Sequence, residues 1–65
     1  MSVERVCEYI KRESGRIQVH NVMLHCGLSR DETIMILEDL KAKGILAGNA
    51  KDGYWLTREG WLKIK

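Results

Sequence analysis

Gly27-Leu28-Ser29-Arg30-Asp31-Glu32-Thr33 is typical of a turn between two helices followed by the first turn of the second helix. Glycine suits the left-handed backbone conformation just after a helix, and the apolar side chain of Leu28 beside it is expected to be buried nearby. Ser29 and Glu32 have the spacing of a capping box, in which each side chain accepts a hydrogen bond from the backbone N–H of the other residue. A helix is therefore predicted to begin at Ser29.

The residues before this turn predict a short helix. Its apolar residues recur at positions i, i+3, i+4 and i+7 and form one stripe, made of Val19, Val22, Met23 and Cys26. Two short amphipathic helices joined by a glycine turn indicate a helix-turn-helix. The second helix is expected to end just before Gly44, with lysines in its last turn that complement the helix dipole.

The N-terminal part of the chain predicts one more helix. Ser2 can cap it, and Ser14-Gly15 ends it. The apolar positions at helical spacing in between are Val3, Val6, Cys7 and Ile10. The next three residues, Arg16-Ile17-Gln18, alternate polar and apolar side chains and predict a brief edge strand.

The C-terminal part predicts a β-hairpin. Ile45-Leu46-Ala47 and Tyr54-Trp55-Leu56-Thr57 are strand-prone runs, separated by the turn-rich residues 48–53 that end in Asp-Gly. Thr57 can cap a last short helical turn over residues 58–62, which Gly60 weakens. Residues 1–65 are thus expected to form one α+β domain, a small winged helix-turn-helix with three helices and a two- to three-stranded antiparallel hairpin sheet.

Composition limits the class of protein. A chain of 65 residues lies near the lower limit for folding on a hydrophobic core alone. It contains no apolar run long enough to span a bilayer, and its N-terminus lacks a signal-peptide core, so a cytoplasmic protein without a membrane partner is expected. In a reducing compartment Cys7 and Cys26 are expected to be small apolar residues of the helix stripes.

From Gly27 to Gly60 the chain resembles the winged helix-turn-helix domains of bacterial and archaeal transcription regulators. The shared features are Leu40 near the end of the recognition helix, the step Lys43-Gly44-Ile45 into the hairpin, and the pattern Tyr-x-Leu-Thr-x-x-Gly over residues 54–60. The resemblance implies that helix 29–43 enters the major groove of double-stranded DNA and that wing 48–53 contacts the backbone, in transcription regulation or DNA replication. Winged helices also serve as protein-docking modules, so this alternative stays open.

The outward face of the predicted recognition helix departs from the regulator pattern because it is acidic. A helical projection places Thr33, Ile36, Leu37 and Leu40 on the buried side. It places Asp31, Glu32, Met35, Glu38 and Asp39 outward, with Ile34 at the boundary. Residues 29–39 carry a formal charge of −3 and the remaining chain +5, and carboxylates oppose contact with phosphates. Local pairs, Glu38 with Lys41 and Asp39 with Lys43, are expected to offset part of this charge.

Two sets of candidate site residues follow. The DNA-binding set combines the start of the helix with surrounding bases: Ser29, Arg30, Asp31, Ile34, Met35, Lys51, Arg58 and Arg16, with Lys63 and Lys65 as further phosphate contacts. Arg30 is the strongest of these, since a helix N-terminus already favours anions. The protein-docking set is an exposed methionine and isoleucine ringed by acids: Ile34, Met35, Glu38 and Asp39.

Trp55 is expected on the outer face of the hairpin, because strand alternation places Tyr54 and Leu56 together on the other face. It can pack against Trp61 or Ile64. Alternatively, Trp55, Trp61 and the C-terminal turn can form the interface of a homodimer, and stacking on a base of single-stranded nucleic acid is a third interpretation.

The sequence predicts no metal site, no cofactor and no enzymatic activity. His20, His25 and Cys26 fit no common zinc spacing, and the two histidines are expected to face solvent. The chain has no glycine-rich phosphate loop and no nucleophile elbow.

Overall fold

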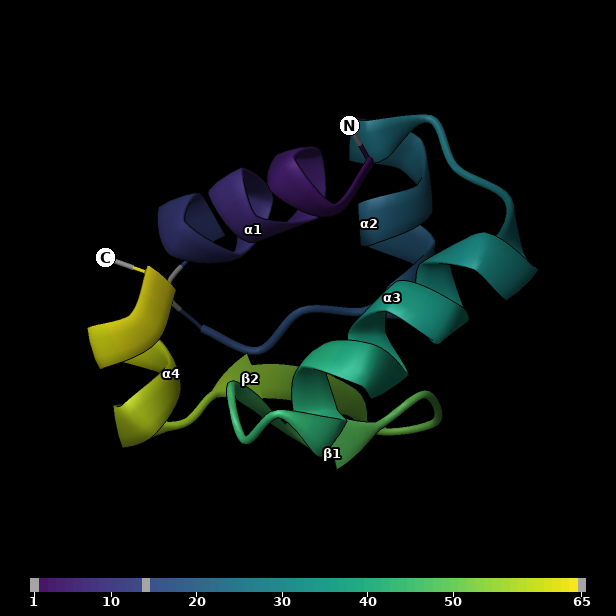
Figure 1. Ribbon diagram of the computed structural model, residues 1–65. Coiled ribbons are helices and arrows are strands. Elements are labelled where there is room, and N and C mark those ends of the chain that lie inside the picture. Colours follow the sequence, from purple (N-terminus) through teal and green to yellow (C-terminus); the bar gives the residue numbers. More distant parts are fainter. Residues whose placement is uncertain (1, 14, 65) are drawn as a thin grey trace.

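Four helices and one antiparallel hairpin make up residues 2–13 and 15–64, the part of the chain that the computed structural model describes, with the side chains of Ser2 and Ile64 excepted. In chain order the elements are α1 (Ser2–Glu13), α2 (Val19–Cys26), α3 (Arg30–Ala42), β1 (Leu46–Asn49), β2 (Gly53–Leu56) and α4 (Arg58–Ile64) (Figure 1). The predicted α+β class with a small winged-helix-like arrangement is confirmed. The predicted roles of the Ser2, Ser14, Ile64 and Lys65 side chains lie outside the described residues.

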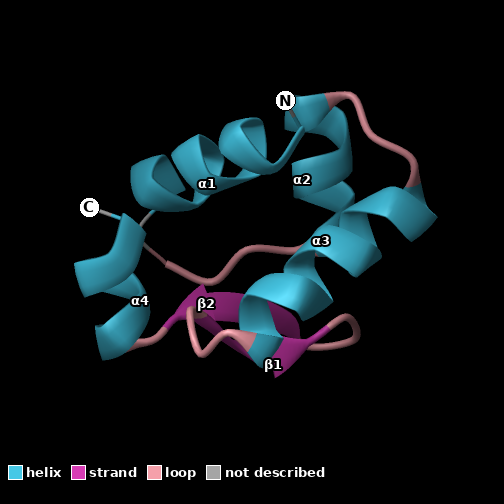
Figure 2. Ribbon diagram, in the orientation of Figure 1, coloured by secondary structure: helices cyan, strands magenta, loops and turns pink. Residues whose placement is uncertain are grey.

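α1, α2 and α3 lie on one side of the molecule and the hairpin on the other, with α4 beside the hairpin (Figure 2). α1 packs on α2 and α2 on α3, while β1 packs against α3 and α4 against β2 (Figure 2). Between these elements lies a core of twelve buried apolar residues: Val6, Tyr9, Ile10, Ile17, Val19, Val22, Cys26, Leu37, Leu40, Ile45, Leu46 and Tyr54. None of the four described helices is long and apolar enough to cross a membrane.

The turn between α2 and α3 has the predicted geometry. Gly27 is left-handed, with φ 66°, and its N–H and that of Leu28 both donate to the carbonyl oxygen of Met23, at 2.9 and 3.2 Å. Leu28 is half-buried against the core. The Ser29 hydroxyl accepts from the Glu32 N–H at 3.2 Å and caps α3. The second bond of the predicted capping box, from the Ser29 N–H to the Glu32 carboxylate, is not formed, although the structure describes both residues.

The two strands of the hairpin extend one or two residues into the predicted turn. Its register pairs Leu46 with Leu56 and Asn49 with Gly53, so the connecting loop is only residues 50–52. Asn49 closes this loop, because its side-chain oxygen accepts from the Asp52 N–H at 2.7 Å. Ile45 lies outside the strand, since its N–H bonds to Leu40 instead of to the opposite strand.

The predicted edge strand is reduced to a single antiparallel bridge. Ile17 and Tyr54 exchange both backbone hydrogen bonds, at 2.7 and 2.8 Å. The segment cannot extend further because α2 begins at Val19.

The last helical turn is longer than predicted and becomes α4. Thr57 caps it as expected: its hydroxyl accepts from the Gly60 N–H at 2.9 Å and donates to the Gly44 carbonyl at 2.6 Å. One side chain therefore fixes the start of α4 to the end of the α3–β1 turn.

Both cysteines belong to the apolar interior. Cys26 is buried in α2 and Cys7 is half-buried in α1, and both thiols are free. Burial raises the pKa of each thiol above its ordinary value. This is the environment of a small apolar residue.

Candidate nucleic-acid interface

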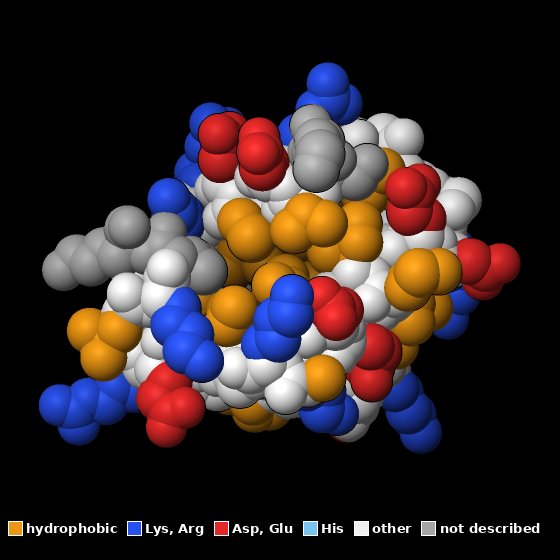
Figure 3. Space-filling model, viewed as in Figure 1, with side chains coloured by type: hydrophobic (Ala, Val, Ile, Leu, Met, Phe, Trp, Pro, Cys, Tyr) orange, Lys and Arg blue, Asp and Glu red, His pale blue; other side chains and the backbone are white. Residues whose placement is uncertain are grey.

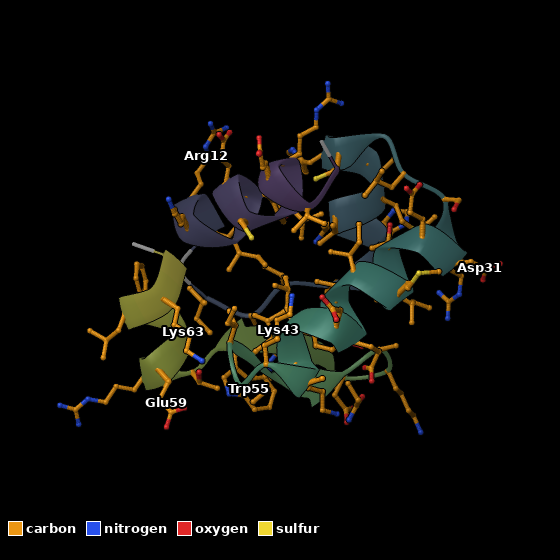
Figure 4. The ribbon with its side chains drawn as sticks, viewed as in Figure 1. Arg12, Asp31, Lys43, Trp55, Glu59 and Lys63 are labelled. Carbon is orange, nitrogen blue, oxygen red and sulfur yellow. The ribbon has the colours of Figure 1, made fainter. Side chains whose placement is uncertain are left out.

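The outer face of α3 carries the predicted recognition residues. Thr33, Leu37 and Leu40 are buried beneath it, while Met35 is 69% exposed. Ile34 is half-buried at the boundary, as projected, and Ile36 is also half-buried although it was placed on the buried side. Figure 4 shows Asp31 at the N-terminal end of α3.

Two of the four acids on α3 are engaged by other side chains. The Tyr54 hydroxyl donates to the Glu38 carboxylate at 2.5 Å, which ties the helix to β2. Asp39 pairs with Lys43 at 3.1 Å, as predicted. The predicted pair of Glu38 with Lys41 is wrong, because the Glu38 carboxylate is turned toward the hairpin. The remaining two acids lie in the first turn of α3, where the helix dipole stabilises negative charges.

The bond from Tyr54 predicts a pH dependence of stability. Burial and the Glu38 carboxylate raise the pKa of Tyr54 from 10.0 to about 12. The folded state therefore retains the phenolic proton at pH values where the unfolded state loses it, so this contribution is complete below pH 10 and is lost as the pH rises toward 12. Urea unfolding across this range should show a fall of about 2 to 3 kcal/mol in the free energy of unfolding from this residue.

Tyr54→Phe is the control for this pH dependence, since it keeps the ring and removes the titrating group. The variant should be less stable than the wild type by about 1 kcal/mol near neutral pH. Its stability should then decline less between pH 10 and 12 than that of the wild type. Equal declines in the two proteins would show that Tyr54 does not hold its proton against Glu38.

Two of the predicted bases lie at one end of the molecule. Arg30 is exposed in the first turn of α3, and Lys51 is exposed in the loop between β1 and β2. Both segments project toward the same side in Figure 1. The structure therefore brings Ser29, Arg30 and Asp31 to the same side as the wing residue Lys51.

Two other predicted bases lie elsewhere. Arg58 begins α4, which is at the opposite end of the molecule from the wing loop (Figure 1). Lys63 donates to the Lys43 carbonyl at 3.1 Å and caps the end of α3 (Figure 4). Its ammonium is thus occupied within the fold, and the predicted rim of bases around α3 is interrupted here.

Trp55 is on the outer face of the hairpin, as predicted, and is 39% exposed. Its neighbour is the Arg16 guanidinium, 5.2 Å from the ring centroid. The predicted packing of Trp55 on Trp61 is not found: within residues 2–13 and 15–64 the one stacked ring pair is Tyr9 with His25, at 4.8 Å. A homodimer through Trp55 and Trp61 stays a prediction.

No sequence signal linked Arg16 to Trp55, since the contact depends on the Ile17–Tyr54 bridge.

The histidines are exposed, as expected, and His25 lies on the Tyr9 ring. Within the described ranges no three His, Cys, Asp or Glu side chains are grouped so that they can hold a metal ion.

A second surface feature is an open hollow of about 390 Å³ along α1, with Lys63 of α4 at its edge. Figure 3 shows apolar side chains gathered below α1 in the middle of the view. Val3 and Cys7 line the hollow, and charged residues surround them: Glu4, Glu8, Lys11 and Lys63. The sequence did not predict this surface, because Lys63 reaches it only through the packing of α4 in the fold.

No protein-family model, curated protein or solved structure matches this chain. The class of the protein is therefore defined by its fold alone, a helix-turn-helix formed by α2 and α3 followed by a hairpin, in a small winged-helix-like arrangement.

Proposed function

We propose that this chain binds double-stranded DNA, with the start of α3 in the major groove and loop 50–52 on the sugar–phosphate backbone. The observation that supports this best is that the first turn of α3 and the loop between β1 and β2 project toward the same side of the molecule (Figure 1), and that each carries an exposed base, Arg30 on the helix and Lys51 on the wing. A major groove admits one helix, and basic side chains beside that helix neutralise phosphates. A role in transcription regulation or DNA replication suits this activity.

The acidic residues of α3 oppose this activity less than their number suggests. Asp39 is paired with Lys43, which offsets part of its negative charge. Glu38 keeps its charge, but the hydrogen bond from the Tyr54 hydroxyl holds its carboxylate toward the hairpin. Asp31 lies in the first turn, beside Arg30. Carboxylates can also accept hydrogen bonds from the amino group of cytosine in the major groove, so Asp31 can contribute to specificity.

Charge reversal tests the proposal. Arg30→Glu combined with Lys51→Glu should lower the affinity for a random-sequence duplex at low salt by about two orders of magnitude, because two attractive contacts become repulsive. Fluorescence anisotropy of a labelled duplex measures the affinity. Amide chemical-shift titration of the wild type should locate the changes at residues 30–35 and 49–53, and these changes should weaken steeply with added salt.

The matched control changes the net charge equally on another surface. Lys11→Glu combined with Arg12→Glu alters two exposed bases of α1, and Figure 4 shows Arg12 pointing away from α3. This variant should bind within about threefold of the wild type, as expected for distant surface charges that are screened by salt. Equal losses in both variants, or no binding by the wild type at low salt, would overturn the proposal.

A protein-docking module is the second candidate function. It is favoured by the 69% exposure of Met35 and by the hollow beside α1, where Val3 and Cys7 are surrounded by charged residues. The docking set predicted from the sequence is weaker than expected, since Glu38 and Asp39 have partners within the fold and Ile34 is half-buried. A wild type that binds no duplex while its α3 or hollow resonances shift with a protein would favour this function.

A further inference from the structure

Arg16 is exposed, and the backbone beside it is fixed to the hairpin. Its neighbour Ile17 is fixed to Tyr54 by two backbone hydrogen bonds, of 2.7 and 2.8 Å. This bridge places Arg16 at the edge of β2, on the face of the hairpin opposite the core. The side chain then runs across β2 toward Trp55.

Two glycines make room for this arrangement. A Cβ atom at Gly53 would lie only 2.9 Å from the Arg16 Cγ and 3.0 Å from its Cδ, so the arginine stem lies directly on the glycine backbone. A Cβ atom at Gly48 would lie 2.8 Å from the Trp55 ring. On the outer face of the hairpin the two glycines therefore leave room for the Trp55 ring and the Arg16 side chain, and the guanidinium lies 5.2 Å from the ring centroid.

The Arg16 guanidinium has no acidic partner among the described residues. Asp52, the acid of the wing loop, is bonded to the Asn49 side chain through both its backbone N–H, at 2.7 Å, and its carboxylate, at 3.2 Å. A guanidinium held over an aromatic ring keeps the N–H groups at its edge available as a planar pair of donors. Such a pair matches two oxygens of a phosphate group.

We infer that Arg16, held in place by Trp55, is a preformed binding site for a phosphodiester of the DNA backbone. This inference rests on the proposed function and names a further backbone contact beside the wing. Gln18, two residues after Arg16, donates to the Asp52 carbonyl at 3.5 Å, so the site is next to the loop that carries Lys51. Trp55 is a positioning residue, because the cation–π contact reduces the freedom that Arg16 would lose on binding.

Substitutions at the two positions test this inference in a Trp61→Phe background, in which Trp55 is the sole tryptophan of the chain. Arg16→Gln and Trp55→Leu should each weaken duplex binding about five- to tenfold and reduce the dependence of log affinity on log salt by about one phosphate contact. The double variant should bind like the single variants, since both changes remove one contact. Trp55→Phe keeps an aromatic ring and should bind within about threefold of the background protein.

Trp55 emission gives a second readout. Duplex DNA should change this emission in the background protein and not in Arg16→Gln. Thermal unfolding of each variant separates the positioning role from a merely structural one, which would lower the melting temperature and would not alter the salt dependence. Trp55→Leu with wild-type affinity and salt dependence would overturn the inference.

Other ligands are separate arms of the same experiment. Inorganic phosphate that changes Trp55 emission in an Arg16-dependent way, while a duplex does not, would assign the site to a free phosphate and overturn the inference. Tighter binding of a single strand than of the duplex would instead indicate base stacking on Trp55, and would also overturn it. If reversal of Arg30 and Lys51 abolishes duplex binding but Arg16→Gln does not weaken it, the inference fails and the proposed function stands.

Discussion

Gly60→Ala is expected to destabilise the fold by about 3 kcal/mol or more, which is a large part of the stability of so small a domain. An alanine in the middle of a helix is ordinarily about 1 kcal/mol better than glycine, so the expected sign is the opposite of the intrinsic one. The reason is the contact of α4 with the α3–β1 turn. A Cβ atom at Gly60 would lie 2.1 Å from the Ile45 carbonyl oxygen and 2.9 Å from its carbonyl carbon. These are backbone atoms, so α4 itself must move.

Urea unfolding of the variant measures this loss. Leu62→Ala is the control, because Leu62 belongs to the same helix and is 73% exposed. It should change the free energy of unfolding by no more than about 0.5 kcal/mol. A Gly60→Ala protein as stable as the wild type would mean that α4 is not seated on Ile45.

The role of Gly60 illustrates what the sequence could and could not predict. Local signals predicted the cap at Ser29, the left-handed Gly27 and the cap at Thr57, because each depends on residues a few positions apart. Gly60 was interpreted as a weakness of the last helical turn. In the structure a glycine is needed at this position because the α4 backbone closely approaches the backbone of Ile45, fifteen residues earlier. No local sequence pattern predicts such a contact.

The candidate site shows the same division. The positions of Arg30 at a helix start and Lys51 in a hairpin loop followed from the motifs, because these are properties of single elements. The partners of the charged residues did not follow in the same way. Asp39 with Lys43 is a pair within one turn of α3 and was predicted, whereas Glu38 with Tyr54 joins residues sixteen positions apart and was missed. Contacts between elements depend on how the elements pack, which periodicity does not encode.

Gly48→Ala is expected to disrupt the hairpin and to cost about 3 kcal/mol, from strain and overpacking together. Gly48 has φ +105°, a conformation that other residues rarely adopt, and a Cβ atom there would lie 2.2 Å from the Gly53 carbonyl oxygen across the hairpin. The strands would have to separate to admit the methyl group. The free energy of unfolding measures the loss, and amide hydrogen exchange should show it concentrated in β1 and β2.

Gly27→Ala separates strain from lack of space. Gly27 also has a positive φ, of 66°, but a Cβ atom there would meet nothing within 4 Å. This variant should therefore lose only the cost of the left-handed conformation, about 1 to 2 kcal/mol, and keep the hairpin intact. Because Lys51 and the Arg16 site both depend on the hairpin, Gly48→Ala should also weaken duplex binding under conditions where the protein remains folded, whereas Gly27→Ala should weaken it less. Equal stability and equal affinity of the two variants would show that the contact between Gly48 and Gly53 does not hold the wing in place.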